Sequence, residues 1–340
     1  MEVPLFQLAN NNTILSLSSD FILPYDKRPI LSEVITSASI PIIDLIEDHD
    51  IDDDGHAPSP KLVSEISKAC EEYGLFQIVN HGVPQDLCQS VLAVVTKFFQ
   101  LPPEERAQFF TKDHTKKVKV TMWSETFTHP WHPADDFTHF LPESIPEYRE
   151  VFPEYARQIG KLMKTLLRLM SQGLGLKKDY LEDKIGESPS LYSQANYYPP
   201  CPNPELTLGI HDHNDIGALT LLLQSDGVSG LQVFKDGKWL SVDPVPNAFV
   251  VNLADQIQVL SNGRYKSVDH RAITNDCLPR VSLAMFYSPN DETVIGPIED
   301  LIDEEHPRMY RNYTYKEFME EFHRQEGKRR RVKEVFAIQR

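Results

Sequence analysis

The run ALTLLLQSDGVSGLQVFKDGKWLSVDPVPNAFVVNL, from Ala218 to Leu253, decides the fold. It breaks into short apolar segments, and Gly, Pro, Asn or Asp stands between them. DGK at Asp236–Lys238 separates two of these segments and is typical of a tight hairpin turn. RVSLAMFY, from Arg280 to Tyr287, has the composition of a further strand. Short strands at this density, with turn residues between them, predict a β-sandwich or jelly roll.

Helical patterns precede these strands. Apolar residues recur at helical spacing from Ser59 to Tyr73, and Gly74 follows as a stop. After the β-rich run GLFQIVNHGV, a second helix is predicted to open at Pro84. A long amphipathic helix is predicted from Tyr148 to Leu169 despite Pro153. Helices first and strands later favour an α+β chain: a double-stranded β-helix (jelly-roll) core with flanking N-terminal helices.

We divide the chain into three regions that function as one unit. Residues 1–190 form a mainly helical region that packs on the core, 191–300 the jelly-roll core, and 301–340 a helical tail. The tail contains GKRRRVK, Gly327–Lys333, which we interpret as a solvated helix end. A patch for nuclear import or lipid binding is the alternative interpretation.

The bulk composition excludes several classes of protein. Hydrophobic residues make up 41% and charged residues 25% of 340, which is ordinary for a globular protein. A formal net charge of −16 argues against a nucleic-acid partner. No apolar run approaches the length of a membrane span, and MEVPLFQLANNN lacks the features of a secretion signal. The four cysteines form no CxxC pair, so we expect reduced thiols and a cytoplasmic location.

Residues on either side of the Ala218–Leu253 run form a candidate metal site. In HDHND, the residues His211, His213 and Asp215 alternate, so in an extended segment they point to one side. His270, in a second β-rich segment, can supply a further ligand. Two histidines and one carboxylate suit Fe(II) and leave positions open for substrate and oxygen. The same ligands could hold zinc in a hydrolase, although no HExxH-type general base accompanies them.

Arg280 and Ser282 add a second kind of chemistry. They lie two positions apart in a predicted strand and therefore face the same way. A buried guanidinium without a partner is costly, so this arginine needs either an internal acid or a ligand carboxylate. Its planar fork suits a carboxylate. The pair thus points to a carboxylate co-substrate beside the metal.

Over nearly its whole length the chain resembles the plant 2-oxoglutarate- and Fe(II)-dependent dioxygenases, the group that includes flavonol synthase, hyoscyamine 6-hydroxylase and salicylate hydroxylases. The motifs that carry the resemblance are IPIIDL, YGLFQIVNHGVP, NYYPPCPNPELTLG, HND, GLQVFKDGKWLSVDPVPNAFVVNL, HR and RVS. The resemblance implies the iron ligands His213, Asp215 and His270, and 2-oxoglutarate binding by Arg280, Ser282, Tyr198 and Asn196. It implies no catalytic residue beyond the ligands. It also implies O2 as the oxidant and ascorbate as a supporting reductant.

Three departures from the family pattern bear on these expectations. His211 stands where relatives have an apolar residue or proline, and it could compete as a ligand, although the register favours His213. Ala254 replaces a usual glycine, for which we expect a small backbone cost. The stretch between Phe110 and Met122, residues 111–121, is short; it normally borders the substrate, so the usual substrates cannot be assumed.

The substrate pocket is the least specified part of the site. The resemblance places Phe286 as an aromatic wall, and the aromatic patch that includes Trp123 and Phe127 could stack on a planar substrate. Ordinary packing between helices and barrel is the alternative for most of these residues. We predict an oxygenase, monomeric or weakly dimeric, that hydroxylates, desaturates or cyclises a small alkaloid, phenolic or flavonoid, with release of succinate and CO2. A metal-dependent hydrolase and a non-catalytic binding protein are the rival hypotheses.

Overall fold

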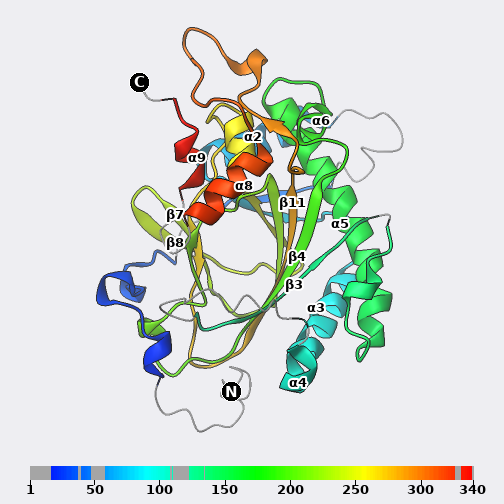
Figure 1. Ribbon diagram of the computed structural model, residues 1–340, viewed down its shortest axis with the longest axis vertical. Coiled ribbons are helices and arrows are strands. Elements are labelled where there is room, and N and C mark those ends of the chain that lie inside the picture. Colours follow the sequence, from blue (N-terminus) through cyan, green and yellow to red (C-terminus); the bar gives the residue numbers. More distant parts are fainter. Residues whose placement is uncertain are drawn as a thin grey trace.

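The computed structural model describes residues 17–36, 40–46, 58–107, 109, 122–133, 135–325 and 331–338. Residues 111–121 and the start of the basic run, 327–330, lie outside these ranges. Two sheets face one another as a jelly roll, and helices cover the larger one (Figure 1). No helix of the described ranges combines the length and the apolar character needed to cross a membrane.

The helices follow the predicted pattern with shifted ends. α2 begins where the Ser59 hydroxyl accepts a hydrogen bond from the Leu62 amide, and it ends before Gly74, whose φ is +65°. The long helix α5 extends beyond its predicted bounds at both ends and contains Pro153. The α-helices are α2 (Pro60–Glu72), α3 (Gln85–Gln100), α4 (Pro103–Arg106), α5 (Pro146–Gly173), α6 (Tyr180–Ile185), α7 (Asp255–Leu260), α8 (Tyr315–Arg324) and α9 (Val332–Val335).

The larger sheet contains strands from the N-terminal region as well as strands from the core region. Its order is β1 (Ile42–Asp44), β2 (Leu75–Val79), β9 (Phe249–Leu253), β6 (Leu219–Gln224), β11 (Arg280–Ser288), β4 (Ser190–Tyr198) and β3 (Glu125–Pro130). β1 and β2 pair in parallel, and the other neighbours are antiparallel. Since β1, β2 and β3 form its two edge regions, residues before 190 complete this sheet as well as packing on it.

The smaller sheet carries the hairpin that the sequence predicts. Its order is β5 (Ile210–His213), β10 (His270–Ala272), β7 (Leu231–Lys235) and β8 (Lys238–Val242). Asp236 and Gly237 turn between β7 and β8 with φ of 50° and 80°, as a type I′ hairpin requires. A third pair, β12 (Val294–Ile295) and β13 (Tyr313–Thr314), lies near the C-terminal helices.

The two faces of the larger sheet differ in character, and this difference creates the site. One face presents Leu221, Val251 and Leu283 to the main core, where α3 and α5 pack against it (Figure 1). Successive side chains of a strand point to opposite faces of the sheet. The opposite face therefore presents Asn196, Ser282 and other polar side chains toward the smaller sheet. The interior between the sheets is therefore polar where strands β3, β4 and β11 meet.

Candidate metal centre

The pairing of β5 with β10 assembles the three candidate metal ligands. His270 lies opposite His213 in this ladder, and Asp215 follows two residues after His213. One ligand atom from each residue lies within 4.8 Å of the others. The Asp215 Oδ1 atom is 3.8 Å from His213 Nε2 and 3.7 Å from His270 Nε2. Residues 57 positions apart in the chain thus place two imidazoles and one carboxylate around a common point.

Hydrogen bonds fix which atoms face that point. His213 Nδ1 is 2.8 Å from the His211 carbonyl oxygen, and His270 Nδ1 is 3.3 Å from that of Val268. Each Nδ1–H donates to a backbone carbonyl, which leaves the Nε2 lone pair for a metal. Thr220 Oγ1 donates to Asp215 Oδ2 at 2.7 Å, so Oδ1 stays directed at the histidines. Thr220 is a supporting residue that sequence reasoning did not single out.

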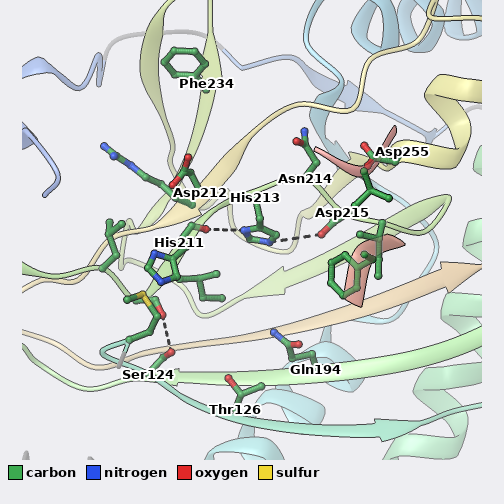
Figure 2. Close-up of a pocket in the computed structure, with 18 of the residues that line it drawn as sticks. Ser124, Thr126, Gln194, His211, Asp212, His213, Asn214, Asp215, Phe234 and Asp255 are labelled. Atoms are coloured by element: carbon green, nitrogen blue, oxygen red, sulfur yellow. Dashed lines mark hydrogen bonds and ion pairs between the residues drawn. The ribbon is translucent and has the colours of Figure 1, made fainter. Parts of the chain in front are cut away.

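The surroundings of His213 favour the neutral form that metal binding needs. Burial lowers the pKa of His213, and the neighbouring His270 lowers it further, while Asp215 acts in the opposite direction. His211 contributes its backbone carbonyl, and its exposed imidazole lies outside the ligand cluster found among the described residues. Figure 2 shows His213 between His211 and Asp215, with its ring directed at the carboxylate.

Arg280, Ser282, Tyr198 and Asn196 lie together on the inner face of the larger sheet. In the β11–β4 ladder Arg280 is opposite Tyr198, and Ser282 is opposite Asn196. All four residues are at most 3% exposed. Thr126 Oγ1 and Gln194 Nε2 both donate to Asn196 Oδ1, at 3.1 and 3.0 Å. The register therefore gathers a cation, two hydroxyls and an amide at one buried position.

The Arg280 guanidinium has hydrogen-bonding capacity to spare. Its Nη2 donates to Gln224 Oε1 at 2.7 Å, and its carbon Cζ lies 4.9 Å from the centre of the Tyr198 ring. Nε and Nη1 are buried, and within the described ranges neither has a hydrogen-bond partner. Burial lowers the pKa of Arg280, but an arginine remains charged at neutral pH. Two free donors on a buried cation are suited to the carboxylate of a ligand.

Two glycines make room for this group. A Cβ on Gly230 would lie 2.9 Å from Arg280 Cδ, and one on Gly209 would lie 2.5 Å from Tyr198 Cδ1. Neither glycine has a positive φ, so close approach of side chains and not backbone freedom requires them. Gln224, Gly209 and Gly230 are site residues that the sequence did not reveal as such.

A cavity of about 2200 Å³ adjoins the ligands and extends past the smaller sheet to the N-terminal segment around residues 23–35. Its inner wall includes Thr126, Thr128, Gln194 and Phe286, and Figure 2 shows Thr126 and Gln194 on the strands opposite His213. Phe286 lies in this wall, and its contact with substrate stays a prediction.

Phe127 and Trp123 do not line this cavity, which corrects their assignment to the substrate pocket. Phe127 is on the outer face of β3, 2% exposed, and its ring stacks on Phe98 at 4.2 Å. Trp123 is 1% exposed, and its Nε1–H donates to the Pro199 carbonyl oxygen at 2.9 Å. Packing between helices and barrel, the alternative interpretation, accounts for Phe127, whereas Trp123 packs in a separate cluster with Leu17, Phe21 and Cys201.

Comparisons with known proteins agree with this geometry. Residues 190–289 match the family model of the 2OG-Fe(II) oxygenase superfamily. Residues 40–154 match that of the non-haem dioxygenase in morphine synthesis N-terminal region. The chain is 43% identical over 319 residues to Protein DMR6-LIKE OXYGENASE 2 of Arabidopsis thaliana, covering 89% of each chain. It belongs to the 2OG-Fe(II) oxygenase superfamily.

Further relatives of this oxygenase include hyoscyamine 6-dioxygenase of Hyoscyamus niger, 35% identical over 91% of this chain and 92% of the relative. Among solved structures, JOX2 in complex with 2OG, Fe and JA superposes with a TM-score of 0.86 at 35% identity. That alignment covers 100% of this chain and 98% of JOX2. The hydrolase and the non-catalytic binding protein are therefore not favoured.

The residues present fit the iron and co-substrate that the family implies. The donor set is two imidazoles and one carboxylate, and the unpaired N–H groups of Arg280 can donate to a second carboxylate. Ala254, which replaces the usual glycine, has φ of −105° and ψ of 175°. Because any residue adopts this conformation, the expected backbone cost is absent.

Proposed function

We propose that His213, Asp215 and His270 hold Fe(II), and that Arg280, Ser282 and Tyr198 bind the distal carboxylate of 2-oxoglutarate, with Asn196 lining the same pocket. The observation that carries this assignment is the pair of N–H groups on the buried Arg280 guanidinium for which no hydrogen-bond acceptor is found among the described residues. A structural arginine would be expected to have an internal acid as partner, and no ion pair to Arg280 is found in the described part of the chain.

The reaction is the oxidation of a small plant specialised metabolite, such as an alkaloid, phenolic or flavonoid, coupled to conversion of 2-oxoglutarate to succinate and CO2. Iron, when bound, supplies the activation of oxygen. The chain itself anchors the co-substrate, favours the neutral form of His213 and holds one C–H bond of the substrate near the metal. The polar wall of Thr126, Thr128 and Gln194 offers hydrogen bonds to oxygen atoms of such a substrate, and Phe286 offers a ring face.

The direct test is spectroscopic. The purified protein is mixed anaerobically with Fe(II) and 2-oxoglutarate, and the visible charge-transfer band of the chelate is recorded. Oxygen is then admitted with a panel of phenolics, flavonoids and alkaloids, and succinate is measured. We expect a band, and succinate release that one class of compound stimulates. No band, together with no succinate from any compound, would refute the proposal.

A related oxidase that needs no 2-oxoglutarate would also retain Arg280 and Ser282. Omission of 2-oxoglutarate separates the two, because only the proposed reaction then stops. Hydroxylation, desaturation and ring closure are distinguished by the mass of the product. A cytoplasmic location, a monomer or weak homodimer, no nucleic-acid partner and support by ascorbate stay predictions from the sequence and the family.

A further inference from the structure

The C-terminal helix α9 brings a lysine from the basic run to the metal centre. Lys333 Nζ donates to Asp255 Oδ1 at 2.8 Å and to the Ser267 carbonyl oxygen at 3.1 Å. The side chains of Lys333 and Asp255 are only 13% and 5% exposed. A solvated helix end would leave the lysine free, so this residue of the run does not fit that interpretation.

Asp255 is in direct contact with the backbone of a metal ligand. Its amide N–H donates to the Asp215 carbonyl oxygen at 2.9 Å. Ser267 Oγ donates to the Asp255 carboxylate at 2.7 Å, and the Ser267 carbonyl accepts from Asn214 Nδ2 at 3.1 Å. Figure 2 shows Asp255, Asn214 and Asp215 grouped at one side of His213. One ion pair thus connects the C-terminal helix with the segment that carries two of the ligands.

The charge on Lys333 matters because Asp255 is a second buried acid beside Asp215. The Lys333 ammonium is in contact with the Asp255 carboxylate, and both side chains are largely buried. Without the ammonium, two carboxylates would share a poorly solvated region with no cation from the protein between them.

The same helix also closes part of the cavity. Val332 is 1% exposed and lines the cavity together with Met319 and Phe322 of α8. Phe336, directly after α9, packs on Tyr313, and the centroids of the two rings are 4.1 Å apart. Lys333 therefore follows directly after a residue of the cavity wall, so loss of its ion pair would loosen that wall.

We propose that Lys333 is a positioning residue for the iron ligand Asp215. It neutralises Asp255, fixes the backbone segment 214–215 through Asp255 and Ser267, and fastens Val332 in the cavity wall. This inference rests on the proposed function only in naming the metal as iron. It assigns the end of the basic run to the metal centre in place of nuclear import or a lipid surface.

Metal binding by purified full-length variants tests the proposal. Co(II), which reports its ligands by visible absorption and needs no 2-oxoglutarate, is titrated into wild type, Lys333→Met, Lys333→Arg and the double variant Lys333→Met/Asp255→Asn. Loss of residues that support metal ligands weakens metal affinity about 10- to 100-fold in other proteins. We expect Lys333→Met to raise the Kd for Co(II) by about tenfold.

The double variant separates charge from packing. It lacks both the ammonium and the charge of Asp255. A Kd that recovers toward wild type assigns the effect of Lys333→Met to the unpaired charge of Asp255, and a Kd that stays as weak assigns it to the lost positioning contacts. Lys333→Arg should stay close to wild type. The exposed Lys178 provides the matched control, and Lys178→Met should leave the Kd unchanged. The KM for substrate should rise in Lys333→Met and not in the control.

Two results would overturn the proposal. One is a wild-type Kd for Co(II) in Lys333→Met, measured below its melting temperature. The other is a Lys178→Met control that weakens Co(II) binding as much as Lys333→Met, which would show that the effect is not specific to the contacts of Lys333. Failure of the proposed function looks different: wild type would bind Co(II) and give no charge-transfer band with Fe(II) and 2-oxoglutarate. Wild type that binds no Co(II) would refute both.

Discussion

Replacement of Arg280 by methionine is expected to affect stability and co-substrate binding in opposite directions. In the free protein Arg280 is 2% exposed, and two of its nitrogens have no partner. An unpaired buried charge costs several kcal/mol, whereas methionine is apolar and flexible enough to fill the space. Removal of the unpaired charge therefore stabilises the free protein. Loss of the hydrogen bond to Gln224 offsets about 1–3 kcal/mol of that stabilisation. We therefore expect the free energy of unfolding without ligand to stay the same or rise.

Binding of 2-oxoglutarate should weaken strongly. Hydrogen bonds to charged groups contribute about 1.5–3 kcal/mol each, so two contacts from Nε and Nη1 amount to about 3–6 kcal/mol. At about 1.4 kcal/mol per factor of ten, the Kd for 2-oxoglutarate rises about 10²- to 10⁴-fold. The wild-type protein gains about 2.7 kcal/mol of stability at a ligand concentration of 100 times Kd, and the variant should gain almost nothing at that concentration.

The assay combines urea denaturation with and without 2-oxoglutarate and anaerobic titration of the Fe(II) charge-transfer band. Arg271→Met is the matched control, because Arg271 is also buried with an unpaired nitrogen but follows His270 on the opposite face of β10. Its Kd for 2-oxoglutarate should change less than about threefold. Loss of more than about 2 kcal/mol of unliganded stability in Arg280→Met, with an unchanged Kd, would show that Arg280 is structural.

Three further predictions concern single side chains. His213→Ala should abolish Co(II) binding while His211→Ala retains it, as measured by visible absorption; the reverse result would shift the ligand register by two residues. Phe127→Ala should cost about 3–5 kcal/mol of unfolding free energy with unchanged substrate preference, whereas Phe286→Ala should alter KM values across the compound panel. Burial lowers the pKa of His129 to about 4. Because the unfolded chain takes up this proton first, stability should fall by about 3 kcal/mol from pH 7 to pH 4, and His129→Gln should flatten this dependence in urea denaturation. An equal pH dependence in the two proteins would contradict that assignment.

The strand-rich half of the fold could be predicted because its signals are local. The turn at Asp236 and Gly237 requires positive φ values, and Asp-Gly is the sequence that provides them. The apolar segments of β6, β7 and β9 are each bounded by turn residues. Spacing alone left His211 and His213 as equal candidates, since both point to one side of an extended segment; the choice of His213 came from the family register.

The location of Phe127 needed information that local pattern does not contain. Glu125–Pro130 forms an edge strand, and the alternation Thr126, Phe127, Thr128 is the sequence signal for two different faces. Nothing local says which face meets the helices. That depends on the pairing of β3 with β4, which lies about 65 residues further along the chain. The ion pair from Lys333 to Asp255 spans 78 residues and was equally invisible in the sequence.

The apolar face of the larger sheet explains why the co-substrate pocket keeps its geometry. A slip of β11 by one residue against β4 would turn Arg280 and Ser282 toward α3 and α5 and place Val281 and Leu283 in the interior. Such a slip would bury a guanidinium in an apolar core and remove Leu283, which is fully buried, from that core. The packing of the helices thus fixes the register of β11, and the register in turn sets which side chains face the interior, where we propose that 2-oxoglutarate binds. Substitutions in the core at Leu283, on the opposite face of β11 from Ser282, should therefore weaken 2-oxoglutarate binding indirectly, as anaerobic titration of the charge-transfer band would measure.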